Sequence, residues 1–139
     1  QDIEKSLSQG RSLILFPEGT STKGIEVLPF KSTVFELFLN DELKNDLIVQ
    51  PFTLTLQGIN THKPPVDIKA HDIYAWYGDM ELEPHMWALA LSKGVDILIT
   101  FHSPIKAADH TDRKVFAKEC HTLTAQGLVN TLATPLISA

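Results

Sequence analysis

Three short apolar runs alternate with segments of helical pattern, and this alternation limits the folds that the chain can adopt. The runs span residues 12–16, 47–56 and 95–101, and their short length and flanking turn residues favour strands. Helical segments lie around and between them, an order typical of layered α/β folds. We therefore expect an α/β fold with a partly parallel sheet flanked by helices. In the second run Pro51 lacks a backbone N–H, which predicts an edge position, a bulge or a split strand.

Capping residues locate the helices. Gly10 follows an amphipathic segment at the position of a left-handed C-terminal cap, and Pro84 stands at a first helical position. The helix that contains M-W-A-L-A-L (residues 86–91) is apolar all round, which favours burial in a core, with contact to a membrane as the alternative. The expected helices are Asp2–Ser8, Ser32–Leu39, Pro84–Lys93 and Asp112–Leu132, and Ile68–Tyr77 could hold one short strand.

Composition narrows the classes of function. The chain has 139 residues, 12 Lys and Arg against 17 Asp and Glu, and a net charge of −5. Nucleic acids and anionic membrane surfaces require clustered positive charge, so no nucleic-acid partner is expected. The single cysteine, Cys120, excludes a disulfide framework and is expected in the core. The histidines and carboxylates lack the spacing of a site such as H-E-x-x-H, so no metal is expected.

The stretch F-P-E-G-T-S-T, which leaves the first apolar run, carries most of the chemistry. The carboxyl ends of strands in open α/β sheets are where ligands bind. Gly19 has no Cβ, so the backbone there can approach a ligand closely, and Lys23 and Lys31 add positive charge suited to a phosphate or glycerol head group. The alternative is a solvated turn in which Glu18 and Thr20 only cap backbone groups. The expected substrate-binding residues are Pro17, Glu18, Gly19, Thr20, Ser21, Thr22 and Lys31.

These motifs, in this order, resemble a known family. F-P-E-G-T followed by L-P-F-K is similar to the third conserved block of the 1-acylglycerol-3-phosphate acyltransferases, a glycerolipid acyltransferase family. The V-Q-P at residues 49–51 stands where that family has its fourth block. Residues 76–80 (WYGDM) and 84–87 (PHMW) look like the C-terminal part of bacterial members. The resemblance covers residues 7–105.

The resemblance implies an acyltransferase of phospholipid biosynthesis. In that family a fatty acyl group passes from acyl-carrier protein or acyl-CoA to the hydroxyl of a lysolipid such as 1-acylglycerol-3-phosphate, and no cofactor takes part. The F-P-E-G-T loop binds the acceptor, with Glu18 and Gly19 shaping the pocket and Thr20 near the head group. The implied location is the cytoplasmic side of the bacterial cytoplasmic membrane, as a peripheral or N-terminally anchored protein.

One position departs from the family pattern. The residue after P-E-G-T is usually Arg, which forks onto a phosphate with two hydrogen bonds, whereas this chain has Ser21. Either Lys23 or Lys31 supplies the missing charge, or the acceptor is not a phosphomonoester. A lyso-ornithine lipid is the alternative acceptor, because related bacterial acyltransferases use it.

The family's catalytic pair, His-x-x-x-x-Asp, does not precede F-P-E-G-T in this chain. In the family the histidine is the general base and the aspartate orients it. His62 and Asp67 have the same spacing but follow the block, and Pro64 and Pro65 prevent the helical turn that would join them. No catalytic residue is therefore expected. Residues 1–139 are expected to be the C-terminal portion of a single acyltransferase domain, inactive alone, that meets the membrane surface through a missing N-terminal region.

A non-catalytic role is the alternative function. The acyltransferase motif is also compatible with a domain that binds a lipid head group, or acts as a scaffold, without transferring an acyl group. The two hypotheses differ in what they require upstream. A His-x-x-x-x-Asp block between a strand and a helix favours the enzyme, and its absence favours the scaffold.

Overall fold

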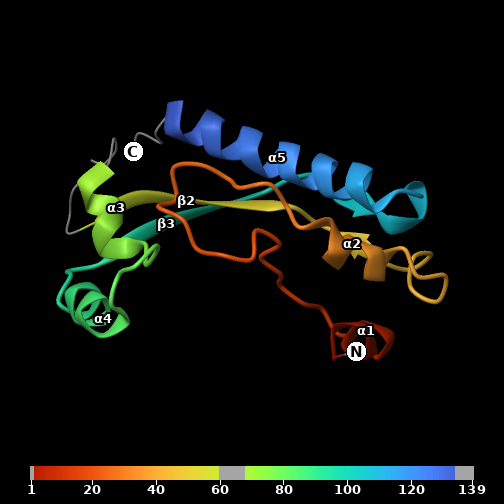
Figure 1. Cartoon of the computed structure of the whole chain (residues 1–139). Helices are drawn as coiled ribbons and strands as arrows, with labels where there is room; N and C mark the ends of the chain where they lie inside the picture. The colour runs from red at the N-terminus through yellow and green to blue at the C-terminus, as the bar shows by residue number, and fades with distance from the viewer. Residues whose placement is uncertain (1, 60–67, 134–139) are drawn as a thin grey trace.

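Two strands form a long antiparallel ribbon that organises the fold in the computed structural model of the chain (Figure 1). They are β2 (Phe52–Ile59) and β3 (Val95–Phe101), paired from Phe52 opposite Phe101 to Ile59 opposite Val95. The structure describes residues 2–59 and 68–133. The remaining elements are α1 (Asp2–Ser8), α2 (Ser32–Phe38), β1 (Ile48–Val49), α3 (Ile68–Tyr74), α4 (Leu82–Ala90), β4 (Ile105–Lys106), a 3-10 turn (Ala107–Asp109) and α5 (Arg113–Ala133).

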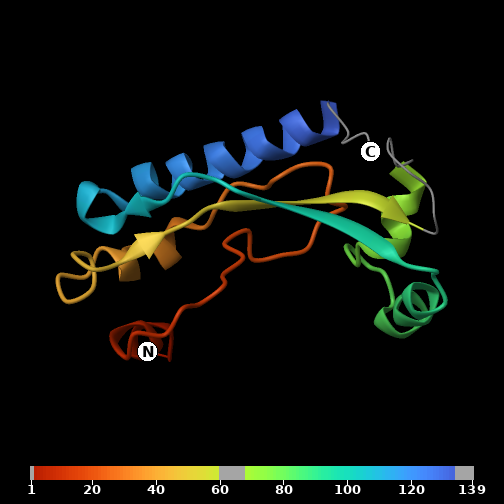
Figure 2. The same cartoon turned by 180° about the vertical axis from the view of Figure 1, so that it is seen from behind.

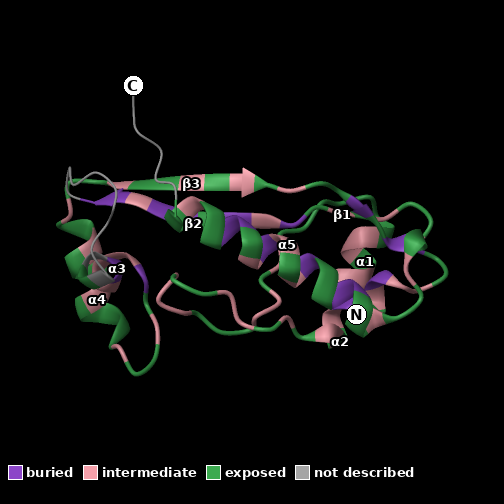
Figure 3. Cartoon of the chain, turned by 90° about the horizontal axis from the view of Figure 1, so that it is seen from above, coloured by how far each residue is buried: buried purple, intermediate pink, exposed green. Residues whose placement is uncertain are grey.

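Helix α5 lies along one face of the ribbon, as both side views show (Figures 1 and 2). It begins after Asp112, whose Oδ1 accepts hydrogen bonds from the backbone N–H groups of Lys114 (2.7 Å) and Val115 (3.0 Å). This cap satisfies two N–H groups that have no partner inside the helix. The predicted helix Asp112–Leu132 is therefore confirmed. Buried residues follow the inner side of α5 and strand β2, whereas β3 has none (Figure 3).

A polar seam joins α5 to β2 where a purely apolar contact is the usual arrangement. The hydroxyl Oγ1 of Thr53 donates to the backbone carbonyl of Thr124 (2.8 Å). The same oxygen lies 2.8 Å from Nε2 of His102, and because the hydroxyl proton is already used, the histidine N–H is the donor of this second bond. The buried Thr53 hydroxyl therefore has a partner both as a donor and as an acceptor. The seam fixes how closely the helix approaches the strand.

Gly127 makes this close approach possible. A Cβ at this position would lie 2.5 Å from Oγ1 of Thr53 and 2.6 Å from Nε2 of His102, distances that side-chain carbons do not adopt. We expect Gly127→Ala to lower the free energy of unfolding by about 1–3 kcal/mol, because the overpacked seam outweighs the better helix propensity of alanine. Urea unfolding followed by circular dichroism measures this change.

The control for this variant is Gln126→Ala, since Gln126 is exposed on the same helix. It should change the free energy of unfolding by no more than about 0.5 kcal/mol. A Gly127→Ala protein that is as stable as the unmodified chain would show that α5 does not lie this close to β2.

The main hydrophobic core lies where α2 meets the first half of α5. Phe116 is fully buried there, with its ring centroid 5.2 Å from that of Phe35 and 6.5 Å from that of Phe38. The ring of His110 stacks on that of Phe116, with a centroid distance of 4.3 Å. The predicted helices Ser32–Leu39 and Asp2–Ser8 are confirmed by α2 and α1, and α2 contributes two of these rings.

Cys120 lies on the inner face of α5, as predicted. Its side chain is buried, and loss of solvation raises the pKa of the thiol to about 12. A thiol with so high a pKa is almost wholly protonated at neutral pH. Cys120 is therefore a packing residue rather than a nucleophile.

Two strand predictions are not met, because the described residues lack the partner strands that they require. Residues 12–16 form no strand, and Leu13, Ile14 and Phe16 are exposed, with Ile14 at 73 %. A strand needs a hydrogen-bonded neighbour, and no described strand pairs with this run, although the ring of Phe16 contacts that of Phe52. The expected partly parallel sheet is also not seen, because β2 pairs with β3 and β1 with β4, both antiparallel, among the described residues. The observed fold is mixed α/β with short antiparallel strands.

Pro51 divides the second apolar run into two strands. β1 ends at Val49 and β2 begins at Phe52, so of the three predicted outcomes the split strand is the correct one. The carbonyl of Pro51 still accepts a hydrogen bond from the N–H of His102 (2.9 Å), although its nitrogen cannot donate. β1 then pairs with β4 instead of β3.

Two predictions for the middle of the chain were wrong. Residues 68–74 form helix α3, where a strand was expected. Helix α4 was expected in a core, but Met86, Trp87 and Leu91 are more than half exposed. An apolar sequence favours burial only where another surface covers it, and the contact of α3 with α4 leaves no residue of α4 buried. No helix within the described ranges is long and apolar enough to span a membrane.

Candidate functional site

The F-P-E-G-T segment begins a loop, orange in Figure 1, that is closed at its base by two hydrogen bonds. The backbone N–H of Lys31 donates to the carbonyl of Pro17 (2.9 Å). The backbone N–H of Leu28 donates to Oε2 of Glu18 (2.7 Å), a short bond to a charged acceptor. Glu18 thus holds the two ends of the loop together, which matches both its expected role in shaping a pocket and the alternative reading as a backbone cap.

Gly19 makes a tight turn with a side chain lying across it. Its φ is +68°, a left-handed conformation that favours glycine, and its N–H donates to the carbonyl of Phe16 (3.2 Å). A Cβ here would lie 2.8 Å from Cε of Lys31. The Lys31 side chain therefore passes directly over the glycine, which brings its ammonium group to the P-E-G-T turn. Gly19 of F-P-E-G-T and Lys31 of L-P-F-K therefore form one structural unit.

The hydroxyl-bearing residues of the loop have different environments. Thr20 and Ser21 are exposed. Oγ1 of Thr22 accepts a hydrogen bond from the N–H of Gly24 (3.2 Å), so this hydroxyl stabilises the next turn. Of the predicted hydroxyl groups, those of Thr20 and Ser21 are presented to solvent at the turn that Lys31 overlies.

Lys23 does not offer its positive charge to an acceptor, because an acidic and an aromatic side chain contact its ammonium group. Nζ lies 2.9 Å from Oδ1 of Asp72 and 5.7 Å from the centre of the Tyr77 ring. The Tyr77 hydroxyl donates to the same carboxylate oxygen (2.7 Å). The hydrogen bond to Asp72 raises the pKa of Lys23 and, reciprocally, lowers the pKa of Asp72. The pair is therefore charged at neutral pH and largely neutralises itself.

Two histidines, which sequence reasoning assigned no role, hold the loop from outside. Nδ1 of His71, on α3, lies 3.0 Å from the carbonyl of Lys23, and Nε2 of His121, on α5, lies 3.1 Å from the carbonyl of Val27. A carbonyl accepts only, so each of these ring nitrogens carries the proton. Because α3 is a helix, neighbouring His71 and Asp72 both reach Lys23, whereas on a strand they would face opposite sides. No sequence motif signals these contacts.

The structure thus separates the two lysines that could replace the missing arginine. Within residues 2–59 and 68–133, Lys31 has no carboxylate partner, whereas Lys23 has Asp72. Ser21 supplies no charge. The positive charge that the loop offers to an acceptor is therefore that of Lys31. The predicted site residues 17–22 and 31 are brought together by the loop.

The structure bears on the metal site but not on the His62–Asp67 pair. No group of three or more His, Cys, Asp or Glu side chains that could hold a metal ion occurs in the part of the chain that the structure describes. His62 and Asp67 lie outside the described residues. What the described site offers is a rigid turn, two exposed hydroxyls and one ammonium group, which suits binding of an anionic or hydroxylated head group.

Comparison with known proteins gives a consistent result. The family model described as Acyltransferase matches residues 1–55. The chain is 31% identical to a lyso-ornithine lipid O-acyltransferase of Rhodobacter capsulatus over 91% of this chain and 44% of that protein. It is 28% identical to the enzymes of the same description from Brucella abortus, over 84% and 44%, and Rhizobium meliloti, over 81% and 39%. The chain therefore spans less than half the length of these relatives. No solved structure matches it significantly.

Proposed function

The chain belongs to the acyltransferase family, and from this premise we propose that it forms the acceptor-binding part of a lysolipid O-acyltransferase. The observation that carries the proposal is the position of Lys31 over Gly19 in a loop closed by Glu18. This arrangement holds one ammonium group at Gly19, the residue that precedes Thr20 and Ser21 in the turn. Such a site neutralises an anionic head group without closing around it.

For the acceptor we propose a lyso-ornithine lipid in preference to a lysophosphatidic acid. Three relatives carry that activity in their descriptions. A phosphomonoester is best held by a forked guanidinium, and this chain has Ser21 at that position. An ornithine head group joined through its α-amide retains its side-chain ammonium and a single carboxylate, and one lysine ammonium can pair with that carboxylate. The single charge of Lys31 matches that demand.

The proposed reaction is acyl transfer from a thioester. The acceptor hydroxyl attacks the thioester carbonyl, the new ester C–O bond forms, the C–S bond breaks, and the hydroxyl proton ends on the departing thiol. The donor is acyl-carrier protein or acyl-CoA, and the reaction needs no cofactor or metal. We propose that it takes place at the cytoplasmic face of the membrane where the lysolipid resides. The general base is not assigned to any described residue.

The proposal predicts an acceptor preference that depends on position 21. The full-length protein should acylate lyso-ornithine lipid with a kcat/KM about 10-fold above that for lysophosphatidic acid. Ser21→Arg should shift this ratio toward lysophosphatidic acid by about 10-fold, because a guanidinium adds two hydrogen bonds to a phosphate. Acylated product is measured with each acceptor at a fixed donor concentration.

Ser21→Ala is the matched control, since it changes the same position without adding charge and should leave the ratio nearly unchanged. Preference of the unmodified protein for lysophosphatidic acid would contradict the acceptor assignment. Failure to acylate either lysolipid, combined with retained binding of lyso-ornithine lipid, would favour the non-catalytic head-group binder.

A further inference from the structure

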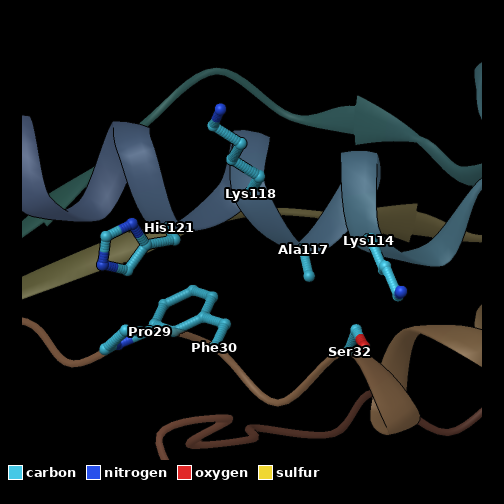
Figure 4. Close-up of a pocket in the computed structure, with 7 residues that line it drawn as sticks. All are labelled: Pro29, Phe30, Ser32, Lys114, Ala117, Lys118 and His121. Carbon is cyan, nitrogen blue, oxygen red and sulfur yellow. The ribbon is translucent and has the colours of Figure 1, made fainter.

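A shallow hollow of about 240 Å³ lies between α5 and the segment that follows the acceptor loop (Figure 4). Pro29, Phe30 and Ser32 form its loop side. On the helix side the charged and polar lining residues are Lys114, Lys118 and His121, which lie on successive turns of α5. In Figure 4 Lys114 extends toward Ser32 and His121 lies beside Pro29 and Phe30, whereas Lys118 extends away from the loop segment.

The hollow is basic although the chain as a whole is acidic. None of its lining residues is a carboxylate, and neither lysine has an ion-pair partner among the described residues. The carboxylates near the hollow interact with groups other than Lys118. Glu36 pairs with Arg113, Glu119 lies 3.3 Å from the ring of His110, and the Asp112 carboxylate accepts from the N–H groups at the start of α5.

Two cations follow the capping carboxylate of Asp112 at the start of α5. The N-terminal end of a helix carries a partial positive charge, so cations in the first turn are unfavourable there. The first turn of α5 has no acidic residue but contains Arg113 and Lys114. The Asp112 carboxylate caps this helix end and lies in the field of Lys114, so the ammonium of Lys114, and not the helix end, is the group that attracts an anion at this side of the hollow.

The hollow and the acceptor loop share one short segment of chain. Lys31 stands between Phe30 and Ser32, and its backbone N–H is bonded to Pro17 while its side chain overlies Gly19. The carbonyl of Val27 is bonded to His121, which lines the hollow. The hollow and the P-E-G-T turn are therefore connected through Lys31, which lies between two residues that line the hollow.

We propose that this hollow binds the phosphate of the phosphopantetheine arm through which the acyl donor carries its thioester. The inference rests on the proposed acyl transfer, in which a donor must reach the acceptor loop. Acyl-CoA and acyl-carrier protein share this arm, so one phosphate site serves either. The Lys114 ammonium and the Ser32 hydroxyl supply the donors of a phosphate site, and Lys118 contributes from the rim.

The test compares donor and acceptor kinetics in the full-length protein. Lys114→Ala should raise the KM for acyl-CoA and for acyl-carrier protein about 5–10-fold each and leave the KM for the lysolipid unchanged. Lys118→Ala should raise the donor KM less. Lys44→Ala, which removes a cation that pairs with Asp41 and does not line the hollow, is the control and should change neither KM.

Comparing the two acyl donors shows whether Lys114 contacts the phosphate that they share or the surface of the carrier protein. A rise for acyl-carrier protein alone would overturn the phosphate site and point to the acidic surface of the carrier protein. An unchanged KM for both donors would also overturn it.

A second readout does not depend on turnover. In a thermal-shift titration of the unmodified protein, phosphopantetheine should stabilise more than pantetheine, which lacks the phosphate, and Lys114→Ala should abolish the difference. Equal effects of the two ligands on the unmodified protein would reject the site. If no acyl transfer is detected but the phosphate-dependent difference is present, the proposed function fails and the binding site stands.

Discussion

Replacing Phe116 by alanine is expected to lower the free energy of unfolding by about 3–5 kcal/mol, the largest stability effect we expect in this chain. Phe116 is fully buried and its ring contacts those of Phe35, Phe38 and His110. Truncation removes the buried ring and leaves a cavity where α2 meets α5. A chain with so few buried side chains has little stability to spare. Chemical unfolding measures the loss.

Two further variants keep this prediction testable if the alanine protein does not fold. Phe116→Leu retains most of the apolar volume and should cost about 1–1.5 kcal/mol. Val129→Ala shortens an apolar side chain on the same helix that is 62 % exposed, and should cost no more than about 0.5 kcal/mol. Losses of equal size at positions 116 and 129 would show that the aromatic cluster is not the core of this fold.

The elements that sequence reasoning identified correctly are those specified by local residues. Asp112 and Gly10 mark a helix start and a helix end, and Pro51 divides two strands, because each acts on its own backbone. The ribbon partner β3 matched its predicted range of residues 95–101. These signals need no knowledge of what lies opposite in space.

The predictions that failed depended on a neighbour. The run at residues 12–16 and the apolar helix α4 have the composition of buried elements, yet Phe16 and Trp87 are 64 % and 65 % exposed. Phe101 and Ile99 on β3 are likewise exposed on the face of the ribbon away from α5. An apolar composition indicates that a surface favours burial, but it does not indicate which segment covers that surface.

For the site, the loop residues were predictable and the contacts that hold them were not. The F-P-E-G-T and L-P-F-K motifs located Glu18, Gly19 and Lys31 because their spacing is local. The choice between Lys23 and Lys31 required the structure, since Asp72 lies 49 positions along the chain from Lys23, on a helix that the sequence pattern does not predict. An ion pair between residues so far apart in the chain cannot be predicted from the spacing of residues in the sequence.

Lys31→Met is expected to lower the kcat/KM for the lysolipid acceptor by about 30–150-fold, equivalent to about 2–3 kcal/mol, the largest functional effect we expect. Methionine keeps an unbranched side chain that can still cross Gly19, so the loop shape is retained while the charge is lost. Because Ser21 is neutral and Asp72 holds Lys23, no other cation of the loop replaces it. Acyl transfer at varied lysolipid concentration measures this change, and the KM for the acyl donor should stay the same.

The comparison with the neighbouring lysine makes the assignment specific. Lys31→Arg keeps the charge and should restore the kcat/KM for the acceptor to within about 5-fold of the unmodified protein. Lys23→Met removes a cation of equal charge eight positions earlier, but one that already pairs with Asp72, so its effect on the acceptor should be less than about 5-fold. If Lys23→Met is the more damaging change, the Asp72 pair opens when the acceptor binds and Lys23 is the head-group cation. Equal losses in Lys31→Met and Lys31→Arg would mean that the shape of the Lys31 side chain over Gly19, rather than its charge, is what the acceptor site requires.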